Sequence, residues 1–80
     1  MAYKLFQEVA LRIDIPENDL KKGDVATIVE YHPIANEEDG YTLEIFNALG
    51  ETIDVITVAE SSIEPIRKDE IFNVRSLSVA

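Results

Sequence analysis

The sequence predicts an all-β fold, a small five-stranded antiparallel barrel of the SH3-like type, with an OB-like barrel as the second possibility. Three observations predict it: β-rich segments in which apolar and polar residues alternate, turn formers at intervals of roughly 8–12 residues, and the lack of a helical pattern of about ten residues. With 80 residues, the chain has room for one small domain. A barrel suits such a chain because closure removes the exposed strand edges of a flat sheet.

Five segments carry the strand pattern. In the first, Val9, Leu11 and Ile13 alternate with polar or small residues, as expected for a half-buried strand. The second is a β-branched run whose apolar residues change parity, which predicts a bulge near Ala26 or Thr27, or burial on both faces of the strand. We expect the strands over residues 7–13, 24–31, 41–47, 52–58 and 63–66.

The remaining segments before residue 66 are predicted to be connections. Residues 16–23 are rich in turn formers and predict an irregular loop in which Leu20 points inward as an anchor. Residues 59–62 resemble a single helical or 3₁₀ turn. Near the N-terminus, we expect Leu5 and Phe6 to plug the end of the core.

The chain divides into a barrel domain, residues 1–66, and a C-terminal apolar arm, residues 67–80. The arm is too apolar for a solvated tail, since it contains Ile71, Phe72, Val74, Leu77 and Val79. We expect it to add a sixth strand, to cover the barrel mouth as a short helix, or to pair with a second copy of the chain. Packing against its own barrel is the simpler alternative.

Acidic residues outnumber basic ones, with 16 Asp and Glu against 7 Lys and Arg, and the net charge is -9. The excess lies between Gly23 and Ile66, a segment with ten acidic residues and no basic one. Solubility is one interpretation, and an electrostatic face that docks a basic protein partner is the other. The candidate partner contacts are acidic residues of this segment, with two tyrosines as anchors: Glu30, Tyr31, Glu37, Glu38, Asp39, Tyr41, Glu44, Glu51 and Asp54.

Few residues suit catalysis or metal binding. The sequence has no cysteine, which excludes disulfides and thiolate sites, and its single histidine, His32, lies at a strand end, where we expect a solvated or locally bonded side chain. The acidic run 37–39 lacks the ligand spacing of a calcium loop, and the glycines lie too far apart for a phosphate loop. We therefore expect no enzyme activity, no cofactor and no metal site. Neither a signal peptide nor a membrane-spanning run is recognisable, so we expect a cytoplasmic protein.

Three functions remain open. The first is a non-enzymatic protein-binding module that uses the acidic segment. The second is a structural or accessory subunit that self-associates through residues 68–80. The third is nucleic-acid binding, which the negative net charge disfavours and which would depend on basic residues near the two ends of the barrel: Lys4, Arg12, Lys21, Lys22, Arg67 and Lys68.

The turn Lys22-Gly23-Asp24 before a β-branched strand resembles the KOW-type opening of many small SH3-like barrels. Together with Phe6-Gln7-Glu8-Val9-Ala10-Leu11, Tyr41-Thr42-Leu43-Glu44-Ile45-Phe46 and Ile63-Glu64-Pro65-Ile66, it resembles a bacterial family, common in cyanobacteria, known as domain of unknown function 4926, over roughly residues 4–66. One departure is Ala26, where the pattern has a second glycine. The resemblance implies a small barrel and no transferable catalytic residue. Because members are similar to products of short gene cassettes beside larger genes of toxin or nuclease type, it also implies an antitoxin or immunity role toward a basic toxin or nuclease.

Overall fold

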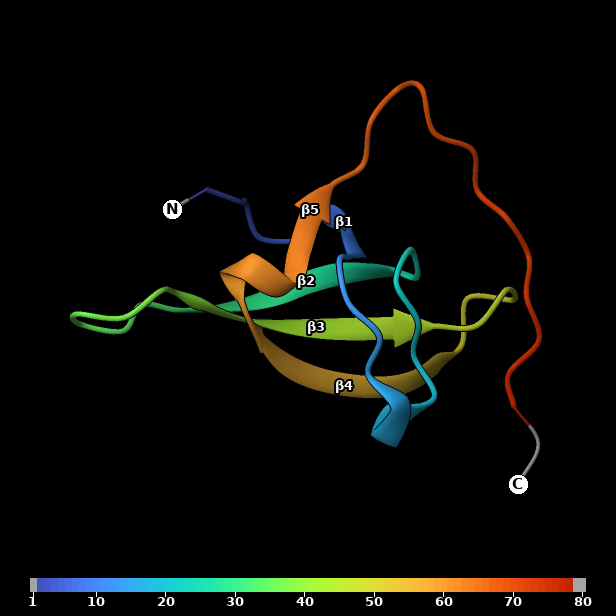
Figure 1. The fold of residues 1–80 in the computed structure, drawn as a ribbon, viewed down its shortest axis with the longest axis horizontal. Helices are drawn as coiled ribbons and strands as arrows, with labels where there is room; N and C mark the ends of the chain where they lie inside the picture. Colours follow the sequence, from blue (N-terminus) through green and yellow to red (C-terminus); the bar gives the residue numbers. More distant parts are fainter. Residues whose placement is uncertain (1, 79–80) are drawn as a thin grey trace.

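The computed structural model describes residues 2–78, which form five β-strands and two short 3₁₀ helices (Figure 1). The strands are β1 (Glu8–Leu11), β2 (Val25–His32), β3 (Gly40–Phe46), β4 (Thr52–Ala59) and β5 (Ile63–Pro65). The 3₁₀ helices are η1 (Pro16–Asn18) and η2 (Glu60–Ser62), and η2 occupies the position predicted for a single turn. Within residues 2–78, no helix has the length and apolar character needed to cross a membrane.

All five strands belong to one antiparallel sheet, in the order β4-β3-β2-β1-β5. Consecutive hairpins join β2, β3 and β4, and β5 returns to lie beside β1. Figure 1 shows that β1 and β5 run across the direction of β2, β3 and β4, so that the sheet curls around its inner face. The predicted all-β, barrel-like fold of five antiparallel strands is confirmed.

The core lies on the inner face of the curled sheet. Tyr41, Leu43 and Ile45 alternate along β3 and are buried there, as their spacing predicts. Leu20 is buried as the predicted anchor of its loop, and its backbone bonds to Ile15 across η1. The other large buried side chains come from β1, β2 and β5: Val9, Leu11, Ile28 and Ile63. Every buried side-chain nitrogen or oxygen in the described residues has a hydrogen-bond partner.

The predicted position of the bulge in β2 is wrong. The register of β2 against β3 shifts between Ile28 and Glu30, not at Ala26 or Thr27. Ala26 and Ile28 are both buried, so β2 keeps one parity up to Ile28 and changes it only afterwards. The bulge therefore follows the buried pair.

Two expectations near the N-terminus are also wrong. Leu5 and Phe6 do not plug the core, because their side chains are 47% and 72% exposed. Tyr3 covers this end of the core instead: its ring meets Tyr41 edge-on, with 5.5 Å between ring centroids. Ile13 is exposed rather than inward-facing, because β1 ends two residues before it.

The C-terminal arm forms neither a strand nor a helix over residues 67–78, so the expected sixth strand or short helix is absent from its described part. Figure 1 shows this segment leaving β5, arching away from the sheet and returning along one side of the barrel. Four apolar side chains remain exposed on it: Ile71, Phe72, Val74 and Leu77. Val79, which the sequence also suggested as an apolar contact, lies outside the described residues.

Candidate functional site

The candidate partner contacts do not form one face. One group lies at the end of the β2–β3 hairpin and comprises Tyr31, Glu37, Glu38 and Asp39. A second group, Glu44, Glu51 and Asp54, lies at the β3–β4 turn, and Glu30 projects from the exposed side of β2. Figure 1 shows the two hairpin ends on opposite sides of the molecule, the β2–β3 loop in green and the β3–β4 turn in olive. The acidic candidate contacts are therefore divided between the two hairpin ends and β2 rather than gathered on one surface.

The end of the β2–β3 hairpin carries the denser group of carboxylates, because η2 packs beside it. The amide of Glu60 donates to the Asp39 carbonyl at 2.8 Å, and the amide of Ser61 donates to Glu38 Oε1 at 2.8 Å. The Tyr31 hydroxyl donates to Asp39 Oδ2 at 2.8 Å. We call Glu37, Glu38, Asp39 and Glu60 the acidic end.

Tyr41 was a candidate surface anchor, but the structure contradicts that role. Its side chain is 0% exposed, and its ring lies between those of Tyr3 and Tyr31, each with a centroid separation of 5.5 Å. Only its hydroxyl reaches the acidic end, where it donates to Glu60 Oε1 at 3.1 Å. Tyr41 is thus a core residue that fixes the position of Glu60.

These contacts shift the ionisation of the groups involved. Burial, followed by the hydrogen bond to Glu60, raises the pKa of Tyr41 to about 12. The hydrogen bond to Asp39 raises the pKa of Tyr31 above its ordinary value. Hydrogen bonds from Ser61 hold the pKa of Glu38 below its ordinary value. At neutral pH, both tyrosines therefore remain neutral and donate hydrogen bonds to Asp39 and Glu60.

An open hollow of about 560 Å³ lies at the acidic end. Its acidic wall is formed by residues 37–39, and apolar surface is supplied by Ile34, Val58 and Ala59. The Glu37 carboxylate makes no hydrogen bond or ion pair with any described residue. No group of three or more His, Asp or Glu side chains within residues 2–78 is arranged to hold a metal ion.

Carboxylates at the β3–β4 turn make local hydrogen bonds. Glu44 accepts from the Thr52 hydroxyl at 2.6 Å, and Glu51 accepts from the side-chain amide of Asn47 at 2.8 Å. Asp54 accepts from Asn18 of η1 at 2.9 Å. Each of these acids therefore supports a turn or joins η1 to β4.

The ion pairs are distributed unevenly along the chain. Among the described residues, Arg12 pairs with Glu64, Arg67 with Asp69 and Glu70, and Arg75 with Asp24. None of these pairs uses a carboxylate from residues 30–60. Between described residues, the ion-pair contact in that segment joins Glu30 to His32 at 3.7 Å. Neither acidic group is neutralised by a lysine or arginine within the described part of the chain.

His32 lies at the end of β2, where its side chain is bonded locally. Its Nε2 lies 2.7 Å from the Thr42 hydroxyl and 3.7 Å from Glu30. The Thr42 hydroxyl in turn lies 2.9 Å from that of Thr57. A histidine that activates a hydroxyl needs its carboxylate on the other ring nitrogen. Here both contacts involve Nε2, so this arrangement does not have the order required of a general base.

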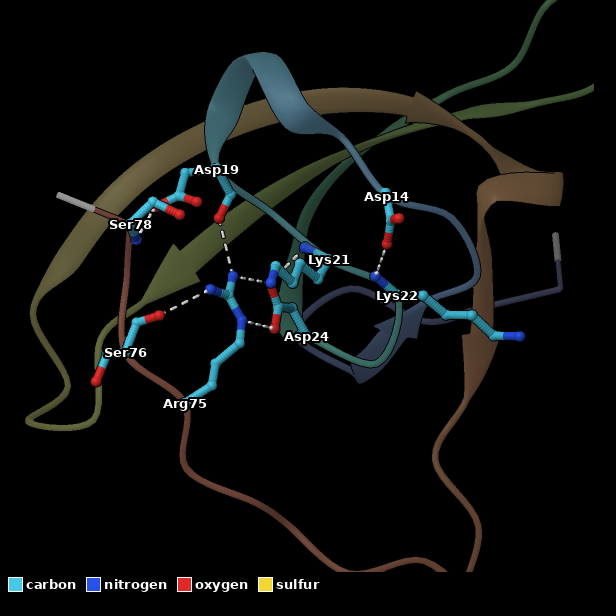
Figure 2. A network of polar contacts seen from close by, with 8 residues as sticks. All are labelled: Asp14, Asp19, Lys21, Lys22, Asp24, Arg75, Ser76 and Ser78. Carbon is cyan, nitrogen blue, oxygen red and sulfur yellow. Dashed lines mark hydrogen bonds and ion pairs between the residues drawn. The ribbon is translucent and has the colours of Figure 1, made fainter. Parts of the chain in front are cut away.

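A second polar network holds the arm to the barrel (Figure 2). The Arg75 guanidinium donates to both carboxylate oxygens of Asp24, at 2.9 and 2.5 Å, and to the Asp19 carbonyl at 2.8 Å. The Ser78 amide donates to Asp19 Oδ2 at 2.7 Å. Asp24 also accepts from the Lys21 amide at 2.8 Å. We call this network the clasp.

The clasp fixes the charge state of Asp24. Burial acts to raise the pKa of Asp24, but hydrogen bonds from Arg75 and the Lys21 amide outweigh it and hold the pKa below its ordinary value. The hydrogen bond to Asp24 likewise raises the pKa of Arg75. A two-point contact between a guanidinium and a carboxylate also fixes geometry. The clasp thus sets the position at which the arm meets the barrel.

Two of the basic residues considered for nucleic-acid binding are engaged with acids. Arg12 lies 3.8 Å from Glu64, and Arg67 lies 3.1 Å from Asp69. The others are lysines in three separate exposed segments: Lys4, Lys21, Lys22 and Lys68.

Comparisons with known proteins give one match. No curated protein and no solved structure matches the chain. The sequence model of the family described as Domain of unknown function (DUF4926) matches residues 5–65, which contain all five strands and both 3₁₀ helices. The arm follows this region. Since the match covers well over half of the 80 residues, the chain belongs to the DUF4926 family.

Proposed function

We propose that this protein is a non-enzymatic protein-binding module that recognises a basic partner protein through its acidic end. The observation that carries the proposal is the absence of lysine or arginine partners for the carboxylates of residues 30–60 within the described structure. The ion pairs that arginines make within the described structure all use acids outside residues 30–60. Unneutralised carboxylates attract a positively charged protein and accelerate its association.

The hollow at the acidic end suits a lysine or arginine side chain. Ile34 and Val58 offer apolar surface to the methylene stem, and Glu37 has a carboxylate without a described internal partner. Glu38 and Asp39 are held in place by Ser61 and Tyr31. A basic side chain would thus meet positioned acids at little cost in side-chain entropy.

An antitoxin or immunity role is one form of this function. The family resemblance supports it, since a basic toxin or nuclease would present the lysines and arginines with which it binds nucleic acid. By occupying that surface, the acidic end would compete with the nucleic acid for the same cations.

The experiment is affinity capture at low salt, followed by binding measurements on the purified partner. The combined change Glu37→Gln and Glu38→Gln is expected to slow association by about three- to tenfold, because each exposed charge contributes only a fraction of a kcal/mol. Glu17→Gln with Asp14→Asn is the matched control, since it removes two exposed charges outside the acidic end. Equal effects of the two double variants, or binding indifferent to salt, would refute the proposal.

A further inference from the structure

The outer edge of β4 and residues 71–78 of the arm both lack a partner strand in the described structure. β4 is an edge strand, paired only with β3. Residues 71–78 of the arm have no regular structure, and the amides of 71–77 donate no hydrogen bond within the described residues. Both segments are eight residues long. Unpaired strand edges and extended segments of this kind associate by strand addition.

β4 has few of the features that protect an edge strand from pairing. Its sequence, Thr52–Ala59, contains one charged residue, Asp54, and neither lysine nor proline. Val55 is 56% exposed on the outer face of the sheet, where its direct partner on β3 is Glu44. An incoming strand with apolar residues on that face would cover Val55 from the open side of β4.

The arm has the matching pattern. Phe72 and Val74 are two residues apart, so an extended arm would place both on the same face, and both are exposed in the single chain. The arm does not pair with β4 of its own chain in the described structure, where it leaves from β5 at the opposite edge of the sheet. The clasp then holds Arg75 at Asp24, just before β2.

From these observations we infer that the chain forms a dimer in which residues 71–78 of each copy add as a sixth strand to the β4 edge of the other. The exchange is reciprocal, so each copy supplies one arm and one edge, and the assembly closes without leaving a free arm. Phe72 and Val74 then lie beside Val55 of the second copy. The far end of β4 also supplies Thr57, Val58 and Ala59 to the lining of the hollow at the acidic end, so an arm paired along all of β4 would border the proposed partner site.

The test measures the mass of the intact protein in solution by analytical ultracentrifugation across a concentration series. We expect twice the chain mass, falling to the monomer mass on dilution. Val55→Lys on β4 and Val74→Lys on the arm should each abolish the dimer, since either lysine would place a charge against an apolar side chain of the other copy. Leu49→Lys in the β3–β4 turn is the control, because this exposed apolar residue belongs to neither segment.

Mixing the two deficient variants distinguishes strand addition from other contacts. The Val55→Lys chain keeps a normal arm, and the Val74→Lys chain keeps a normal edge, so one of the two joints can form between them. We expect the mixture to associate while each variant alone stays monomeric. A monomeric wild-type chain throughout the series, or a Val55→Lys chain that still dimerises, would overturn the inference; the second result would mean that arms pair with arms.

Discussion

Replacing Tyr41 by phenylalanine removes one hydroxyl from the core while the ring remains. In the folded chain the ring is fully buried between Tyr3 and Tyr31, and the hydroxyl donates to Glu60. Burial and this hydrogen bond raise the pKa of Tyr41 to about 12. Because the unfolded chain has a tyrosine pKa of about 10, folding favours the neutral hydroxyl over the phenolate.

The sign of the pH effect follows from the direction of the shift. A raised folded pKa contributes stability that is fully present below about pH 10 and is lost as the pH rises toward about 12. For a shift of about two units, the loss is about 1.4 kcal/mol at pH 11 and about 2.7 kcal/mol at high pH. The Tyr41→Phe chain does not lose this stability at high pH, because it has no hydroxyl at that position to ionise. At neutral pH we expect it to be about 1 kcal/mol less stable, through the missing hydrogen bond.

The assay is urea unfolding of both proteins at pH 9 and pH 11. Every other ionisable group is common to both chains, so the difference between the two proteins reports on the Tyr41 hydroxyl. The wild-type chain should lose about 1.4 kcal/mol more than the variant between these pH values. Equal losses, within about 0.3 kcal/mol, would show that the Tyr41–Glu60 contact does not control the titration, since differences that small are common for unrelated sites.

Three further predictions concern the clasp and the core. Arg75→Ala should release the end of the arm, which would appear as a fall in the backbone heteronuclear NOE of Ser78; an unchanged value would mean that other contacts hold the arm. In the wild-type chain, the pKa of Asp24 lies below its ordinary value. The stability that the clasp contributes is therefore present above about pH 4 and is lost as the pH falls through the lower pKa of the folded chain. During acid titration, the heteronuclear NOE of Ser78 should therefore fall only below about pH 4. Release of the arm at a higher pH would show that Asp24 does not control it. Leu43→Ala should lower the free energy of unfolding by about 2–5 kcal/mol, because the side chain is fully buried, and a loss below about 1 kcal/mol in urea unfolding would place it outside the core.

The strands could be predicted because their signal is local. In β3, every second residue from Tyr41 to Ile45 is apolar, and this spacing of two places Tyr41, Leu43 and Ile45 on one face of the strand. The bulge was misplaced because parity shows only that a shift occurs within β2. Its position depends on β3: Ile28 keeps Leu43 as its partner, and the next pair joins Glu30 to Thr42.

The candidate site was harder to predict because it depends on contacts distant in sequence. The acidic residues seemed one group along the chain, but the two ends of β3 carry them to opposite ends of the sheet. Glu60 was not among the candidate contacts, since nothing local indicates that η2 packs beside the β2–β3 loop. The contact from Arg75 to Asp24 spans 51 residues, so a sequence pattern in either segment alone does not reveal it.

Partner binding and dimerisation should respond to salt in opposite directions, because the first brings unlike charges together and the second brings like charges together. Binding of a basic partner at the acidic end gains from attraction between unlike charges, and salt weakens it by screening that attraction. Dimerisation brings together two chains that each carry a net charge of -9, so the same screening reduces a repulsion and strengthens the dimer. Partner binding and dimer mass, measured across one salt series, therefore distinguish the two surfaces. If partner binding and dimer mass fell together as salt rose, the arm and the acidic end would have to belong to a single charged interface.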